Sequence, residues 1–157
     1  MANSRFGPQL LSVYRVIIGG LFLCHGAAAL FGVLGGNMGT GKAVEVAVWP
    51  GWWAALIQFV VGVLVVLGLG TRPAALLGSG SMAYAYFTVH QEHSLLPIQN
   101  GGELSVLFCW TLLLLAVTGP GTFAVDTLLA RGRARHVVPV TAVRLPTAAA
   151  GVPVAAE

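Results

Sequence analysis

The chain has 157 residues, of which 57% are hydrophobic and only 8% carry a charged side chain. Soluble domains have about a quarter of their residues charged, so this composition excludes an ordinary water-soluble domain and indicates a protein of the lipid bilayer. The formal net charge is +3. The arginine-rich stretch at 131–135 is short and has no interleaved aromatic residues, so nucleic acid is not an expected partner.

Four apolar stretches approach the roughly 17 to 25 residues that cross a bilayer. They cover residues 10–34, 52–70, 74–89 and 104–118. The Thr-Arg-Pro connection between the second and third stretches is so short that these helices must be antiparallel neighbours. Small residues permit close helix contact, as at Gly19, Gly20, Gly26, Gly32, Gly62, Ala75, Ser79 and Ala83. We predict an all-α fold, an integral membrane bundle of four antiparallel helices.

Basic residues predict how this bundle is oriented. Four crossings put both termini on the same side as the 71–73 turn, and that side collects Arg5, Arg72, Arg131, Arg133 and Arg135. Because basic residues are enriched in cytoplasmic loops, both termini are predicted to be cytoplasmic.

The composition changes after the fourth apolar stretch. Residues 123–129 are predicted to form a short amphipathic turn at the membrane surface. We predict one membrane domain over residues 1–129. Residues 130–157 are first basic and then rich in Val, Ala and Pro, which is typical of a tail rather than a packed element. This cytoplasmic tail is a candidate contact with a partner protein.

Polar residues inside apolar helices are candidates for function. A helix rises 1.5 Å per residue, and this rise places several titratable residues at one level in the outer half of the bundle: His25, His90, Glu92, His93 and Glu103. Arg15 lies nearer the inner boundary, where it is expected to reach lipid headgroups or to pair with Asp126.

Three ligands are compatible with this polar layer. His90 and His93 with Glu92 are weak candidates for a metal site, because His-x-x-His at a helix end is unspecific. His25 and His90 would ligate a haem only if their rings faced each other. A quinone headgroup needs only an apolar slot and a hydrogen-bonding group such as His25, His90 or Glu103. A purely structural or partner-facing layer stays open as well.

Asn100 and Glu103 also fit a structural role. Asn100 as N-cap and Glu103 three residues later match a capping box at the start of the fourth helix. The glycines and proline at 119–121 are typical of a helix stop.

Several motifs in order along the chain resemble the DoxX family over about residues 8–129. They are Arg15 with His25-Gly26, the Gly-Leu-Gly-Thr-Arg-Pro turn at 68–73, Asn-Gly-Gly-Glu at 100–103, and Gly-Pro-Gly at 119–121 with Asp126. The resemblance implies a small four-helix protein of the bacterial inner membrane that is associated with redox systems, including quinone-coupled thiosulfate oxidation. The positions that match the family pattern are Arg15, His25, Arg72, Asn100, Glu103 and Asp126.

These observations predict an accessory or quinone-contacting subunit of a membrane redox complex, a non-catalytic subunit rather than an independent enzyme. The sequence leaves the cofactor open, with quinone as the candidate, while haem is not expected. Cys24 and Cys109 are isolated in different apolar stretches, so thiol-disulfide exchange is not expected. The alternative is a membrane module without redox function, such as an assembly factor or a small-molecule carrier.

Overall fold

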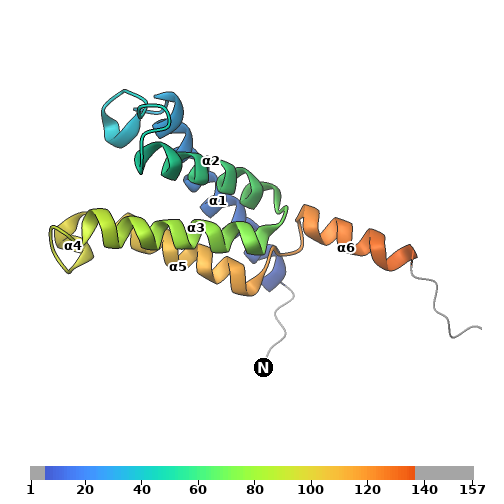
Figure 1. Ribbon diagram of the computed structural model, residues 1–157. Helices are drawn as coiled ribbons and strands as arrows, with labels where there is room; N and C mark the ends of the chain where they lie inside the picture. Colours follow the sequence, from blue (N-terminus) through green and yellow to red (C-terminus); the bar gives the residue numbers. More distant parts are fainter. Residues whose placement is uncertain (1–5, 137–157) are drawn as a thin grey trace, which may run out of the picture.

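The computed structural model describes residues 6–136, with side chains for residues 6–132. Within this range all regular secondary structure is helical, which confirms the predicted all-α class. Four helices are long (Figure 1): α1 (Gly7–Phe31), α2 (Gly51–Leu67), α3 (Thr71–Ala85) and α5 (Glu103–Thr118). The shorter elements are the 3-10 turn η1 (Asn37–Gly39), the π-helical turn η2 (Tyr86–His90), α4 (Pro97–Asn100) and α6 (Val125–His136).

The long helices lie at the four predicted apolar stretches. In the described part of the chain, α1 is the one helix that is long and apolar enough to cross a membrane, while α2 and α5 are shorter apolar helices. Part of the turn predicted at 123–129 is helical: α6 begins at Val125 and runs on past residue 129 into the predicted tail. The Val/Ala/Pro-rich part of that tail, from residue 137, lies outside the described residues.

Helices α1 and α2 form a close pair because glycine brings their backbones together. A Cβ atom on Gly26 would lie 2.7 Å from Cα of Phe59, and one on Gly62 would lie 2.6 Å from Cα of Leu23. The later residue of α1 faces the earlier residue of α2, so the two helices run in opposite directions. The small-residue contacts predicted at Gly26 and Gly62 are therefore confirmed.

Helices α3 and α5 form the second pair. The Ser79 hydroxyl donates to the carbonyl of Cys109 over 2.9 Å. Gly78 leaves space for Leu112, whose Cδ1 would lie 2.9 Å from an added Cβ. These contacts bring α3 against the middle of α5 without an intervening large side chain.

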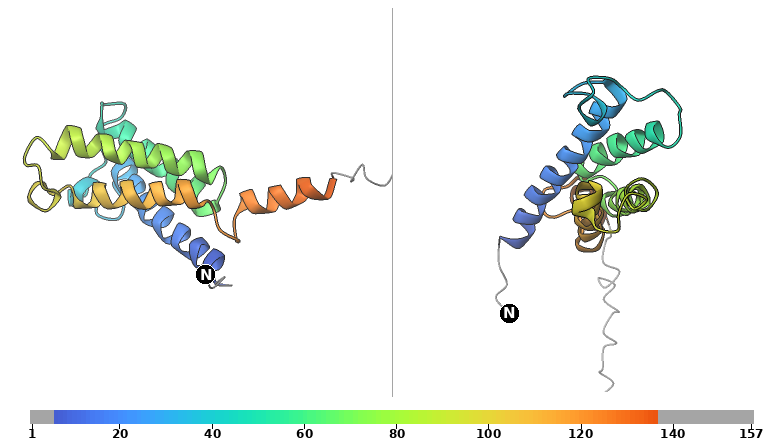
Figure 2. Two further views of the ribbon diagram at one scale, coloured as in Figure 1. Left: turned by 90° about the horizontal axis from the view of Figure 1, so that it is seen from below. Right: turned by 90° about the vertical axis from the view of Figure 1, so that its left-hand side faces the viewer.

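The two pairs meet in one apolar core and then diverge. Phe22 of α1 and Phe108 of α5 pack with ring centroids 5.1 Å apart, and Val61 and Leu112 are buried beside them. In Figure 1 the α1–α2 pair and the α3–α5 pair join near the α2–α3 turn and separate toward loop 32–50. Seen along α3 and α5, helix α1 runs obliquely across them (Figure 2, right). We call the joined end the Arg15 end and the open end the His25 end.

Candidate functional site

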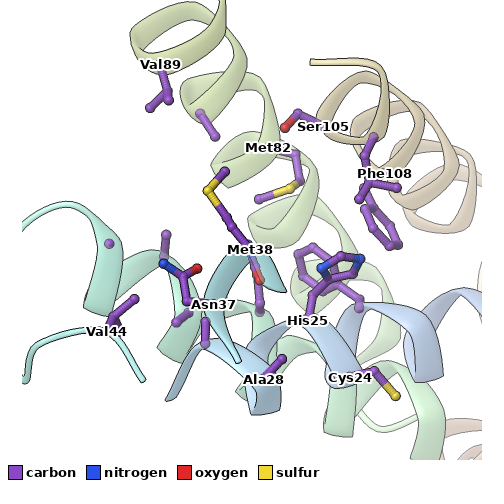
Figure 3. A pocket seen from close by; sticks show the side chains of 18 of the residues that line it. Cys24, His25, Ala28, Asn37, Met38, Val44, Met82, Val89, Ser105 and Phe108 are labelled. Carbon is purple, nitrogen blue, oxygen red and sulfur yellow. The ribbon is translucent and has the colours of Figure 1, made fainter. Parts of the chain in front are cut away.

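A pocket of about 670 Å³ lies at the His25 end, where the two helix pairs diverge. Residues of α1, loop 32–50, α2, α3, η2 and α5 line it. Most of these side chains are apolar. Figure 3 shows Met38 from the loop and Met82 from α3 reaching into the pocket, with His25 and Phe108 beside them. The pocket is therefore an apolar slot with a few polar groups in its wall.

His25 lines the pocket from α1. Its ring stands edge-on to Phe108, with centroids 5.6 Å apart and an interplanar angle of 84°. Phe108 is itself buried against Phe22. The side chain is otherwise exposed, so packing orients the ring and leaves its nitrogen atoms accessible.

His90 lines the same pocket from the π-helical turn η2. Its Nδ1 lies 3.2 Å from the main-chain oxygen of Asn100. Its ring stacks on Tyr86 with centroids 6.5 Å apart and an angle of 26°. The amide of Gln91 donates to the carbonyl of Tyr86 over 2.9 Å, which is the i to i+5 bond of a π turn. Such turns are frequent at functional sites.

Asn100 does not line the pocket; it holds the loop that supports His90. It is buried, and its amide group donates to the carbonyl of Ser94 over 2.7 Å. Its side-chain oxygen accepts from the amide of Gly102 over 2.8 Å. The predicted capping box is wrong in register, because Asn100 is the last residue of α4 and Gly102 occupies the N-cap position of α5. The side chain closes a local turn instead.

The predicted polar layer separates into two groups. His25 and His90 share the pocket, whereas Glu92, His93 and Glu103 are exposed and do not line it. Glu103 is the first residue of α5, where the helix dipole favours a carboxylate. Among the described residues, no three His, Cys, Asp or Glu side chains are grouped so that they could hold a metal ion.

Sequence reasoning missed several polar residues of the pocket. Gln58 on α2, Ser105 on α5 and Asn37 in η1 line it together with the two histidines. Gln58 is a polar residue inside a predicted apolar stretch, and this feature marks it in the sequence as a candidate for function. Asn37 had no such signal, because it reaches the pocket through the fold of loop 32–50. In that loop the amide of Val44 donates to the carbonyl of Ala29 over 2.8 Å, which turns the loop back over the end of α1.

Arg15 organises the opposite end of the molecule. It is 1% exposed. Its guanidinium donates to the carbonyls of Val65 and Val66 over 2.5 and 2.6 Å, and to those of Pro120 and Phe123 over 2.9 and 2.5 Å. The expectation that Arg15 reaches headgroups or pairs with Asp126 is therefore replaced: in the described residues it binds the end of α2 and the α5–α6 connection.

The turn at the end of α2 is shaped around this guanidinium. Gly68 has a left-handed conformation with φ of 71°, and an added Cβ would lie 2.8 Å from Nη1 of Arg15 and 2.6 Å from Cβ of Ala124. Any larger residue at position 68 would be strained by the left-handed φ and would also clash with Arg15 and Ala124. Arg72 is exposed and lies against Gly119, with Nη2 3.3 Å from an added Cβ. The glycine-rich motifs at 68–73 and 119–121 thus meet at the Arg15 end.

Asp126 of α6 caps the start of α3. Its two oxygens accept from the amides of Gly70 and Thr71 over 2.8 and 2.9 Å, and from the Thr71 hydroxyl over 2.9 Å. Burial acts to raise the pKa of Asp126, but the hydrogen bonds from Thr71 and Gly70 and the charge of Arg15 outweigh it and hold the pKa below its usual value. Asp126 supplies to α3 the side-chain cap that its own N-cap residue, Gly70, lacks.

Asp126→Ala is expected to destabilise the protein by about 1 kcal/mol at neutral pH, the usual effect of losing a helix cap. The pKa of Asp126 is lower in the folded state than in the unfolded state. The carboxylate therefore makes its full contribution to the free energy of unfolding above the unfolded pKa of about 3.9, and this contribution is lost as the pH falls through the folded pKa. Thermal unfolding of both proteins in detergent across a pH series should show their difference shrinking in acid. Glu92→Ala, which removes an exposed carboxylate outside the helices, is the control; a difference between the natural chain and Asp126→Ala that is independent of pH would contradict the prediction.

Comparison with known proteins identifies a family and several relatives that cover about three quarters of the chain. Residues 10–91 match the DoxX family. An uncharacterized protein of Haemophilus influenzae is 33% identical over 129 residues, covering 78% of this chain and 92% of that protein. The "Inner membrane protein YqjF" of Escherichia coli is 30% identical over 126 residues, covering 74% and 89%. The "Putative oxidoreductase CatD" of Bacillus subtilis is 29% identical over 119 residues, covering 76% and 86%.

No solved structure matches the chain significantly. The family match covers more than half of the chain and includes Arg15, His25, Arg72 and His90. Asn100, Glu103 and Asp126 lie beyond the residues matched by the family. The chain therefore belongs to the DoxX family of membrane proteins.

Proposed function

We propose that the chain is an integral protein of the bacterial inner membrane. In this proposal α1, α2, α3 and α5 cross the bilayer as an antiparallel bundle, the Arg15 end and both termini are cytoplasmic, and residues 1–129 form the membrane domain. Large apolar side chains stay exposed on all four helices, as at Val16, Val60, Leu77 and Leu107. A soluble monomer rarely leaves so much apolar surface in water. The name of the relative YqjF, an inner membrane protein, supports the same location.

Within that membrane, we propose an accessory, quinone-contacting subunit of a redox complex. The observation that carries this proposal is the apolar pocket with two imidazoles in its wall. Its volume of about 670 Å³ lies in the range of about 300 to 1,000 Å³ that is usual for small-molecule sites. An apolar slot suits a quinone ring, and His25, His90, Gln58 and Ser105 offer hydrogen bonds to its oxygens. The name of the relative CatD adds a link to oxidoreductases.

The pocket also has a position that suits a ligand dissolved in lipid. His25 and Cys24 line it and are exposed on α1, so the pocket is open beside that helix. In a bundle that spans the bilayer, a hydrophobic ligand would enter sideways from the membrane. We assign the contact with other subunits to residues 130–157, of which 137–157 lie outside the described residues.

Extraction with a mild detergent tests the proposed function. The purified chain is expected to retain quinone, at up to about one molecule per chain, together with a redox subunit. Organic extraction followed by chromatography measures the bound quinone, and mass spectrometry identifies the copurified subunit. Ala28→Trp should fill the pocket and remove the quinone, whereas Leu128→Trp, at an exposed position of α6 outside both the pocket and residues 130–157, should not. A natural chain that elutes alone and without quinone would contradict the proposal and favour a carrier or an assembly factor.

A further inference from the structure

The hydrogen bond of His90 fixes where its proton lies. Nδ1 of His90 is 3.2 Å from the main-chain oxygen of Asn100. A carbonyl oxygen can only accept a hydrogen bond, so Nδ1 must carry the proton. In a neutral imidazole the other nitrogen, Nε2, then has a lone pair and acts only as an acceptor. Nε2 lies on the far side of the ring from Nδ1 and therefore points away from the Asn100 oxygen; in the described residues it has no hydrogen-bond partner, and His90 lines the pocket.

The surroundings of His90 hold this arrangement in place. The Asn100 side chain is anchored at Ser94 and Gly102, so the carbonyl that accepts from Nδ1 belongs to a fixed loop. Tyr86 stacks on the ring and is itself fixed by a 2.7 Å hydrogen bond from its hydroxyl to the carbonyl of Leu95. The π turn contains one residue more than an α turn, which rotates the following side chain by about 100°. Val89 and His90 both line the pocket.

The other polar residues of the pocket are less selective. The amides of Asn37 and Gln58 and the hydroxyl of Ser105 have both donors and acceptors, so each can serve a ligand carbonyl or a ligand hydroxyl. His25 makes no side-chain hydrogen bond within the described residues that would fix one tautomer, and its ring contact is with Phe108. His90 is therefore the group whose hydrogen bond fixes what a ligand must offer.

We propose that Nε2 of His90 makes the pocket select the reduced form of its ligand, a hydroquinone, over the quinone. This inference rests on the proposed function. A hydroquinone hydroxyl donates to Nε2, whereas a quinone carbonyl has only lone pairs and leaves that acceptor unpaired. An acceptor that the bound ligand covers without pairing weakens binding by a factor of about ten. His90 thus acts as a specificity residue, and Asn100 and the π turn position it.

Binding of three related ligands tests the selectivity on the natural chain. Isothermal titration calorimetry under nitrogen, on the full chain in detergent, would compare a short-chain hydroquinone, its quinone and the hydroquinone dimethyl ether. We expect the hydroquinone to bind about tenfold more tightly than the quinone. The ether keeps the aromatic ring but has a methyl group in place of each hydroxyl hydrogen, so it has no donor and should bind no more tightly than the quinone.

A pair of variants then assigns the selectivity to His90. His90→Leu should reduce the preference for hydroquinone to within about twofold, while His93→Leu, at an exposed position outside the pocket, should keep it. Equal binding of hydroquinone and quinone by the natural chain would overturn this inference and leave the quinone site intact. A preference that persists in His90→Leu would overturn the assignment to His90. Binding of none of the three ligands would instead contradict the proposed function itself.

Discussion

Arg15→Leu is expected to destabilise the protein by about 3 kcal/mol or more, since each buried polar group left without a partner costs about 1 to 3 kcal/mol. The natural guanidinium binds four carbonyls that belong to two separate segments, the end of α2 and the α5–α6 connection. Leucine fills part of the space but donates no hydrogen bond. The midpoint of thermal unfolding in detergent should fall strongly, and less protein should be recovered from membranes.

Two further variants separate charge from geometry in this prediction. Arg15→Lys keeps the charge, but an ammonium group has three donors at one point and cannot reach both segments as the planar guanidinium does. Its stability is expected to lie between those of the natural chain and Arg15→Leu. Arg131→Leu removes an exposed arginine of α6 and should change the stability by less than about 0.5 kcal/mol. If Arg15→Leu were as stable as Arg131→Leu, the Arg15 end would not depend on its guanidinium.

Arg15 also illustrates which parts of this fold can be predicted from the sequence. Hydropathy marks the long helices because burial in an apolar medium requires long apolar runs. The same runs make a single arginine stand out as unusual. Its partners cannot be predicted in this way, because they are main-chain carbonyls, which every residue has. Only the fold determines that the end of α2 and the 120–123 segment lie within reach of Arg15.

At the His25 end, the helical rise brings His25 and His90 to one level, and the structure places both in one pocket. Their role as ligand contacts stays a prediction. The π turn at Tyr86–His90 had no local sequence signal, because an i to i+5 bond uses the same main-chain groups as an α-helix. The predicted role of Asn100 is wrong for a similar reason. Asparagine is common both as the N-cap of a helix and as a turn residue, so the residue type alone does not show that Asn100 ends α4 and closes a turn.

Gly26→Leu is expected to have the second large effect, because it separates α1 from α2. A Cβ atom on Gly26 would clash with the amide nitrogen of Phe59 and would lie 2.7 Å from the Cα atom of Phe59. These are main-chain atoms of a helix, so they cannot move aside as the end of a flexible side chain can. Overpacking of this kind costs about 1 to 3 kcal/mol and sometimes more. We expect a lower midpoint of thermal unfolding in detergent.

Gly20→Leu is the matched control, because Gly20 lies on the same helix with no atom within 4 Å of an added Cβ. Its stability should stay within about 0.5 kcal/mol of the natural chain, and equal losses in both variants would contradict the assignment of the effect to the contact between α1 and α2. Gly26 also follows His25 directly, so a displaced α1 would move His25 relative to Phe108 and change the pocket. If the pocket binds quinone, the Gly26→Leu protein that remains folded should therefore retain less of it than Gly20→Leu.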